Sequence, residues 1–201
     1  MFARIFGTAL ATALLGIAAP ASAQIGGSDS YKFLQAVRDA KGDDVTAALD
    51  KPGTTIINTR DYKTGETALH IVVKRGDMTY LRFLLAKGAD PNLKDDKGTT
   101  PMLLAATSGA SEMISVLIQQ GANVNLGNSS GETPLIRAVQ NRDLAMVRTL
   151  LTAGADADQP DLLAGKSARD YAVDDARSPA MAKLFADTPK KPRRSVSGPK
   201  F

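Results

Sequence analysis

The stretch Gly65-Glu66-Thr67-Ala68-Leu69-His70 returns as Gly98-Thr99-Thr100-Pro101-Met102-Leu103 and again as Gly131-Glu132-Thr133-Pro134-Leu135-Ile136. The step from each copy to the next is 33 residues. A period of this length is typical of proteins built from stacked structural units. The sequence therefore predicts a repeat architecture, and it favours binding over catalysis as the class of function.

A second block recurs in the same register. Leu84-Leu85-Ala86-Lys87-Gly88-Ala89-Asp90-Pro91-Asn92 has counterparts at 117–125 and 150–158. The two blocks, G-x-T-P-L and L-L-x-x-G-A-x-x-N, closely resemble the ankyrin repeat. That resemblance implies an all-α solenoid of helix–turn–helix units with β-hairpin finger loops, and it implies a binding function.

Several residues of these blocks predict where helices begin and end. A threonine before a helix can cap it, because its hydroxyl accepts a bond from a free backbone N–H. Proline suits the first helical position, and glycine past a helix end adopts positive φ at little cost. The expected caps are Thr67, Thr100 and Thr133, the prolines are Pro101 and Pro134, and the glycines are Gly88, Gly121 and Gly154.

Apolar residues between these signals follow helical spacing, as in Met78, Leu81, Leu84 and Leu85. One helix pair cannot bury such a stripe alone, so neighbouring units must stack. We therefore expect these residues, and their counterparts Met113, Val116, Leu117, Ile118, Leu144, Val147, Leu150 and Leu151, to form the core.

Weaker units flank the three clear repeats. Residues 31–60 predict a helix pair followed by a finger strand at Ile56-Ile57-Asn58, and residues 165–186 predict a terminal pair. Arg169 replaces the usual Leu or Met, which suits a last unit with one face towards water. The predicted organisation is signal peptide 1–23, flexible leader 24–30, ankyrin-repeat domain 31–187 (capping unit 31–61, repeats 62–94, 95–127 and 128–160, capping unit 161–187) and disordered basic tail 188–201.

The N-terminus predicts export. Met1-Phe2-Ala3-Arg4 precedes an apolar run and then Ala21-Ser22-Ala23, an arrangement typical of a secretory signal peptide cut after Ala23. An uncleaved anchor is the alternative, although the apolar run is short for a membrane span. We expect an exported protein of bacterial type, in the periplasm or secreted. With no cysteine, its stability must come from the repeat stack and not from disulfides.

The charge of the chain is unevenly divided. The whole chain carries a formal charge of +4, whereas residues 24–187 hold 19 basic and 21 acidic residues. Five basic residues and no acid lie in the tail, namely Lys190, Lys191, Arg193, Arg194 and Lys200. We expect this tail to be disordered and to contact anionic surfaces weakly. No nucleic-acid partner is expected, because the tail lacks interleaved aromatic residues.

Residues suited to catalysis are scarce. His70 is the sole histidine, and in ankyrin-like repeats a histidine at this position usually bonds to backbone at the finger base. One histidine without a thiol cannot supply a typical zinc site. Gly165-Lys166-Ser167 resembles the end of a phosphate-binding loop, but Pro160 stands where the motif needs glycine. We therefore expect no enzyme, no metal and no cofactor.

The resemblance implies that a protein partner docks on the finger tips and inner helices of a monomeric chain. The finger candidates are Tyr62, Lys63, Asp95, Asp96, Lys97, Asn128 and Ser129. The inner-helix candidates are Lys74, Arg75, Thr107, Ser108, Gln140 and Asn141. Three alternatives stay open: an envelope-associated structural protein held on anionic surfaces by its tail, an enzyme acting through His70, and a secreted effector.

Overall fold

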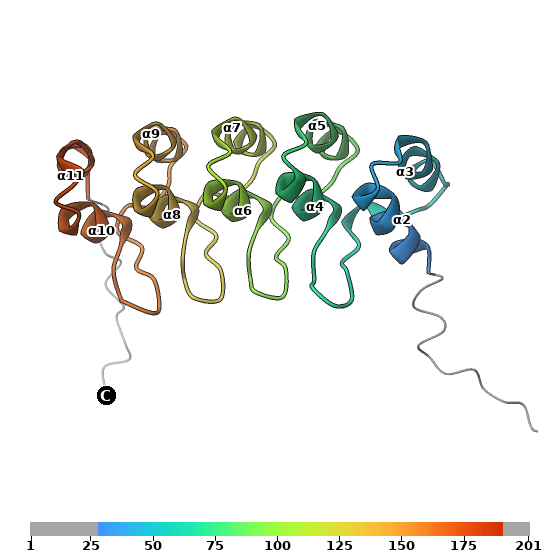
Figure 1. Cartoon of the computed structure of the whole chain (residues 1–201), viewed down its shortest axis with the longest axis horizontal. Helices are drawn as coiled ribbons and strands as arrows, with labels where there is room; N and C mark the ends of the chain where they lie inside the picture. The colour runs from blue at the N-terminus through green and yellow to red at the C-terminus, as the bar shows by residue number, and fades with distance from the viewer. Residues whose placement is uncertain (1–27, 191–201) are drawn as a thin grey trace, which may run out of the picture.

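The computed structural model describes residues 28–190. In this part of the chain, ten α-helices form five pairs that stack side by side in one row (Figure 1). The inner helices, next to the long loops, are α2 (Asp29–Arg38), α4 (Ala68–Arg75), α6 (Pro101–Thr107), α8 (Pro134–Gln140) and α10 (Ala168–Asp174). The outer helices are α3 (Gly42–Leu49), α5 (Met78–Ala86), α7 (Ser111–Gln119), α9 (Leu144–Thr152) and α11 (Pro179–Ala186).

The inner helices begin where the threonines predict. Thr67, Thr100 and Thr133 are the N-caps of α4, α6 and α8. The hydroxyls of Thr100 and Thr133 accept the backbone N–H groups of Leu103 and Ile136, each at 3.2 Å. A proline follows each of these two caps at the start of the helix, as expected.

The glycines past the outer helices also take the expected conformation. Gly88, Gly121 and Gly154 have φ angles of 90°, 80° and 90°. At the end of α5, the Gly88 N–H donates to the Leu85 carbonyl and the Ala89 N–H donates to the Leu84 carbonyl, both at 3.0 Å. This pattern satisfies carbonyl groups that the helix end leaves open, and it turns the chain back towards the next finger.

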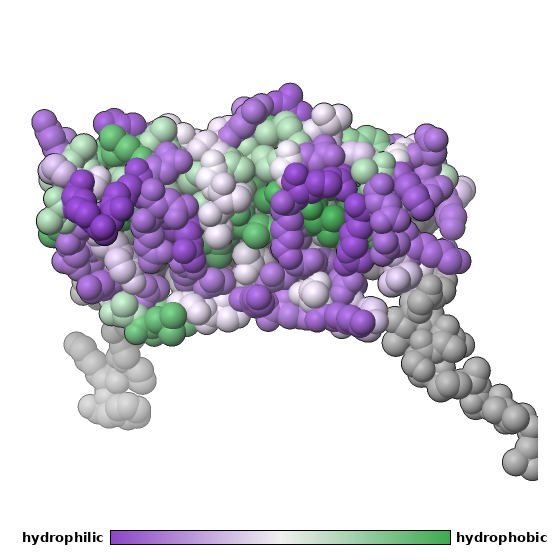
Figure 2. Space-filling view, viewed as in Figure 1, coloured by the Kyte–Doolittle hydropathy of each residue, from purple (hydrophilic) through white to green (hydrophobic). Residues whose placement is uncertain are grey.

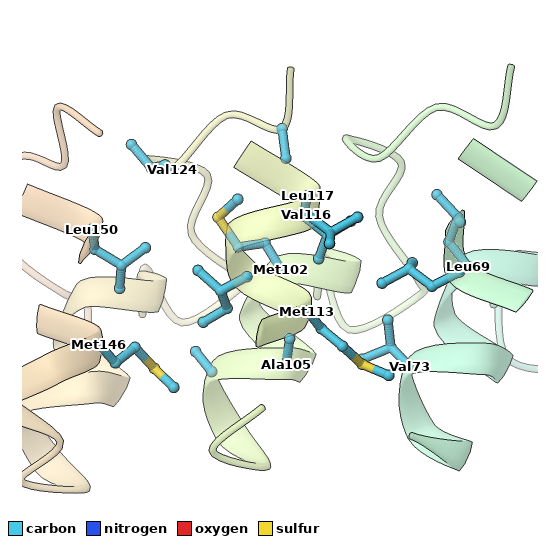
Figure 3. Packing of buried hydrophobic residues seen from close by; sticks show 14 of the residues in the cluster. Leu69, Val73, Met102, Ala105, Met113, Val116, Leu117, Val124, Met146 and Leu150 are labelled. Carbon is cyan, nitrogen blue, oxygen red and sulfur yellow. The ribbon is translucent and has the colours of Figure 1, made fainter. Parts of the chain in front are cut away.

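A single hydrophobic cluster runs the length of the stack, from Phe33 in α2 to Phe185 in α11. Side chains of α4, α6, α7 and α9 point towards one another from neighbouring units (Figure 3). The predicted core positions are buried or, at Met78, Ile118, Leu144 and Leu151, partly buried against the cluster. Each unit therefore completes the core of the unit beside it.

The β-structure expected at the fingers is not seen in residues 28–190. No strand forms there, and the one bridge joins Pro160 to Ser167. The predicted strand at Ile56-Ile57-Asn58 was wrong, because this segment is one turn of 3-10 helix, η1 (Ile56–Asn58), with both isoleucines packed against the core. The bonds across each finger, such as that from the Asp61 N–H to the Glu66 carbonyl at 2.8 Å, are too few to define a strand.

The ends of the array differ in detail from the predicted boundaries. α2 begins at Asp29, inside the predicted leader 24–30, and the Ser28 side chain accepts the Tyr31 N–H at 3.2 Å. At the other end, the Thr188 hydroxyl donates to the Leu184 carbonyl at 2.8 Å. The predicted signal peptide, with its cleavage after Ala23, and the tail beyond Lys190 lie outside the described residues. Within the described part, no helix is both long and apolar enough to span a bilayer.

Candidate binding surface

Four loops project from the inner helices on the same side of the stack (Figure 1). We name them finger 1 (61–66), finger 2 (95–99), finger 3 (128–132) and finger 4 (161–166). Each begins with an Asp or Asn whose side-chain oxygen accepts backbone N–H groups of its own loop, a common way of holding a tight turn. The acceptors are Asp61 for Lys63 and Thr64, Asp95 for Lys97 and Thr99, Asn128 for Ser130 and Glu132, and Asp161 for Leu163, Ala164 and Gly165.

Each finger is also bonded to the finger before it. The Asp96 N–H donates to the Thr64 carbonyl at 3.1 Å. The Ser129 N–H donates to the Lys97 carbonyl at 3.0 Å, and the Leu162 N–H donates to the Ser130 carbonyl at 2.8 Å. We call this series of three bonds the finger ladder. It fixes the spacing between the tips of neighbouring fingers.

The finger glycines allow this close approach. Gly65, Gly98 and Gly131 all have positive φ, between 69° and 75°. A Cβ atom at these positions would lie 2.6, 2.7 and 2.8 Å from the backbone nitrogens of Asp96, Ser129 and Leu162. Any larger residue would therefore push the next finger away as well as strain its own backbone.

The predicted finger residues divide into two groups. Tyr62, Lys63, Asp96, Lys97 and Ser129 have exposed side chains. Tyr62 is 57% exposed with the Lys63 ammonium 5.4 Å from its ring centre, and Asp96 pairs with Arg60 at 3.0 Å. Asp95 and Asn128 are only half-exposed, and their side-chain oxygens hold their own loops. The first group is available to a partner, and the second shapes the surface.

The predicted residues on the inner helices are partly engaged in holding the units together. Arg75 donates to the Val37 carbonyl at the end of α2 at 2.6 Å, with its guanidinium 5.1 Å from the Tyr80 ring centre. Asn141 donates in the same way to the Ala106 carbonyl near the end of α6 at 3.0 Å. Lys74 pairs with Glu66, Thr107 and Ser108 bond to carbonyls of their own helix, and Gln140 is exposed.

A second series of bonds, which the sequence reasoning missed, joins neighbouring units through the segments between the outer helices and the fingers. The Asn92 amide accepts the Asn123 N–H at 2.7 Å and donates to the Gly121 carbonyl at 3.3 Å. Asn125 makes the same two bonds one unit later, to Asp156 at 2.7 Å and Gly154 at 3.2 Å. Asn58 accepts the Asp90 N–H at 2.8 Å in the first unit. The recurring final N of L-L-x-x-G-A-x-x-N is the sequence signal for this asparagine ladder.

The asparagine ladder ends in an ion pair. Asp158 holds the ladder position in the last repeat, and Arg169 binds its two carboxylate oxygens at 2.7 and 3.2 Å. The same guanidinium donates to the Phe185 carbonyl in α11. The expectation that Arg169 faces water is wrong, because its side chain is only 11% exposed. Arg169 lies in the next unit, 161–187, so this ion pair takes the place of the asparagine bonds at the last junction between units.

His70 has the structural role expected of it. The Thr67 N–H donates to His70 Nδ1 at 3.2 Å, so the ring carries its proton on Nε2, which donates to the Thr99 carbonyl at 2.9 Å. The histidine therefore joins the start of α4 to the base of finger 2. Burial lowers the pKa of His70 below its ordinary value of 6.5, which keeps the ring neutral at pH 7. Because both nitrogens are bonded within the protein, His70 is poorly placed to act as a general base.

Comparison with known proteins agrees with this geometry. The sequence matches the family described as ankyrin repeats (3 copies) in two overlapping segments, residues 33–125 and 69–161. The chain belongs to the ankyrin-repeat family. Its repeats are a non-catalytic fold that generally mediates protein–protein interaction.

Curated relatives share only a short part of their length with this chain. An ankyrin repeat protein of Acanthamoeba polyphaga mimivirus is 38% identical over 88 residues, which are 42% of this chain and 12% of the relative. The 2-5A-dependent ribonuclease of Homo sapiens is 32% identical over 42% of this chain and 11% of its own length. Oxysterol-binding protein-related protein 1 of Homo sapiens is 37% identical over 36% of this chain and 8% of its own length. The chain thus spans about a tenth of the relatives it matches.

Proposed function

We propose that this chain is an exported, non-catalytic scaffold that binds a protein partner through fingers 1 to 3 and the neighbouring inner helices. The finger ladder is the observation that carries the proposal. Three backbone bonds and three glycines hold the tips at fixed spacing, so binding a partner costs little loop entropy. The exposed tips carry mixed charges and one aromatic residue, which suits a polar contact of modest affinity.

The exposed finger residues are the ones to change in a test of partner binding. Lys97 is exposed at the tip of finger 2, so a Lys97→Glu substitution reverses one charge there without removing a bond made by its side chain in the described structure. Arg148 is exposed on α9, away from the fingers, so Arg148→Glu is a matched control. We expect Lys97→Glu combined with Tyr62→Ala to reduce capture of the partner at least about tenfold, as for typical interface anchors. Equal capture by the finger variant and the Arg148→Glu control would contradict the proposed surface.

Export is the second part of the proposal, and the sequence of residues 1–23 supports it. The basic start, short apolar run and Ala21-Ser22-Ala23 site together suit a cleaved signal peptide. We expect the mature chain to begin at Gln24 and to be found in the periplasm or the medium. N-terminal sequencing of the fractionated protein tests this, and a chain that retains Met1 in the cytoplasm would contradict it.

A further inference from the structure

The two ends of the stack differ in the side chains that they expose. Three of the four large hydrophobic residues that are exposed among residues 28–190 belong to the last unit, 161–187. They are Leu162 and Leu163 in finger 4, which are 75% and 84% exposed, and Val173 in α10, which is 65% exposed. Figure 2 shows the hydrophobic patch at the tip of finger 4, beside finger tips that are polar or neutral. A terminal unit normally has a polar outer face, so this end of the array departs from the rule.

Val173 stands at a position that is buried in every interior unit. It is the sixth residue after the N-cap of its inner helix. The residues at the same position of α4, α6 and α8 are 2%, 0% and 3% exposed, namely Val73, Ala106 and Val139. Ala172, one position before Val173, is fully buried although no unit follows it in the described chain. The sixth position therefore faces the succeeding unit, and in the last unit no described residue covers it.

The outer helix of the last unit adds a groove beside Val173. The groove has a volume of about 360 Å³, and its apolar lining includes Val173, Ala182 and Ala186. Ala182 is the fourth residue after the N-cap of α11, and the interior outer helices have larger, fully buried residues at this position, namely Leu81, Ile114 and Val147. Asp187 and Lys190 line the same groove, so it carries one charge of each sign. We call the surface formed by Val173, Ala182, Ala186 and this groove the end face.

The opposite end of the stack is adapted to water. The first unit can be matched to the second by the positive-φ residues Ala40 and Gly76, which follow α2 and α4. Lys32 and Asp44 are then exposed at positions where the later units have buried or partly buried side chains. These side chains are Ala68, Pro101, Pro134 and Ala168 at the position of Lys32, and Tyr80, Met113, Met146 and Met181 at the position of Asp44. The outer face of the first unit is thus charged, as a terminal unit requires.

We propose that the end face binds the end face of a second copy of this chain, which gives a symmetric dimer in place of the expected monomer. Apolar surface is best covered by other apolar surface, and the charged first unit does not offer it. A two-fold contact also closes after two copies, and it allows Asp187 of each copy to meet Lys190 of the other. The proposal does not rest on partner binding, because it leaves fingers 1 to 3 free.

The segment that follows Lys190 in the sequence matches the end face less well. Residues 191–201 contain four cations and no acid, and Val196 and Phe201 are their only large apolar residues apart from proline. Such a segment supplies little apolar surface for a face that is itself apolar, so a second copy is the better occupant.

The test is analytical ultracentrifugation of residues 24–201, which include every described residue, over micromolar concentrations. We expect an equilibrium between monomer and dimer with no larger species. Val173→Glu and Ala186→Glu each place a charge at an exposed position of the end face, and each should raise the dissociation constant of the dimer at least about tenfold. Ala47→Glu is the matched control, because Ala47 is an exposed alanine that lines a groove on the outer helix of the first unit. This control should dimerise as the unchanged chain does.

Four results would overturn the proposal. They are a chain that stays monomeric, a dimer that Val173→Glu leaves unchanged, equal weakening by Ala47→Glu, and a series of oligomers longer than the dimer. The last two would indicate head-to-tail stacking, and a monomer that dimerises only when the chain ends at Lys190 would assign the end face to residues 191–201. Lys97→Glu should keep the dimer and Val173→Glu should keep partner capture, so the two surfaces can fail separately. Thermal unfolding of each variant checks that its fold is intact.

Discussion

Fingers 2 and 3 have a neighbouring finger on both sides, whereas finger 4 has one on a single side. Gly98 and Gly131 lie against the backbone of the next finger, but nothing lies within 4 Å of the place where a Cβ of Gly165 would be. In the interior, Asn92 and Asn125 bond to the next unit, while at the end Asp158 bonds to Arg169. The difference teaches that interior units bond to their successors through an asparagine, whereas the junction with the last unit, 161–187, uses an ion pair in its place.

The largest expected effect contrasts the core of an interior unit with that of the last unit. Leu117 in α7 is fully buried between neighbours, whereas Leu184 in α11 is only partly buried. Leu117→Ala should lower the free energy of unfolding by about 2 to 5 kcal/mol, and Leu184→Ala by about 1 kcal/mol. Urea unfolding followed by circular dichroism measures both. Equal losses would show that the last unit is packed as fully as an interior one.

The second contrast concerns the finger glycines. The Cβ added by Gly98→Ala is strained by the positive φ and lies too close to the backbone nitrogen of Ser129. We therefore expect the free energy of unfolding to fall by about 2 to 4 kcal/mol. Gly165→Ala is strained only by the φ of 65°, so we expect the free energy of unfolding to fall by about 1 to 2 kcal/mol. The same unfolding experiment compares them, and a Gly165→Ala loss as large as that of Gly98→Ala would break the distinction between interior and terminal fingers.

The third contrast replaces Arg169 and Asp158 by the kinds of residue that the interior repeats have at these two positions. Arg169→Met restores the kind of residue found at this position in the other repeats, but it removes the donors to Asp158 and to the Phe185 carbonyl. We expect a loss of about 2 kcal/mol, of which Asp158→Asn in the same chain restores part, because a neutral amide tolerates the loss of the guanidinium better. A double-mutant cycle measures the coupling, and additive effects of the two substitutions would contradict the pairing.

The smallest expected effect is a dependence on pH that comes from His70. Burial lowers the pKa of His70 in the folded chain, so the unfolded chain binds more protons near the ordinary pKa of 6.5. The contribution of His70 to stability is complete above pH 6.5, and it decreases as the pH falls from there towards the lowered pKa. Unfolding at pH 7.5 and pH 5 should show this loss.

The matched control for this effect is His70→Gln. Glutamine can still serve the helix start as part of a capping box, but it does not titrate. The variant should therefore show a smaller decrease of stability between pH 7.5 and pH 5 than the unchanged chain. An identical decrease in both proteins would mean that other groups cause the pH dependence.

The features that the sequence predicted are those that depend on nearby residues. Thr100 before Pro101 and Gly88 after α5 act within one turn of the chain, so the local pattern is enough to place the helix ends. The spacing of Leu84 and Leu117 likewise predicts the buried stripe and, with the 33-residue period, the stack itself.

The features that were missed join residues about 30 positions apart. The bonds from Asp96 to Thr64 and from Asn123 to Asn92 depend on how closely two units approach, which no single repeat specifies. The error at Arg169 arose over a shorter separation, since its charge suggested solvent while Asp158, 11 positions before it, and Phe185, 16 positions after it, provide its partners. The tip residues Leu162 and Leu163 were overlooked because an apolar pair after Pro160 resembles ordinary core sequence.

Hydrogen exchange at the finger amides tests the finger ladder most directly. Asp96, Ser129 and Leu162 donate to the preceding finger, whereas Tyr62 holds the same place in finger 1, before which no finger lies among the described residues. We expect the first three amides to be protected by at least about a hundredfold relative to Tyr62, because each must break a bond between units before it exchanges. Exchange of Asp96 and Ser129 as fast as that of Tyr62, in a fully folded protein, would contradict the account of fingers held at fixed spacing.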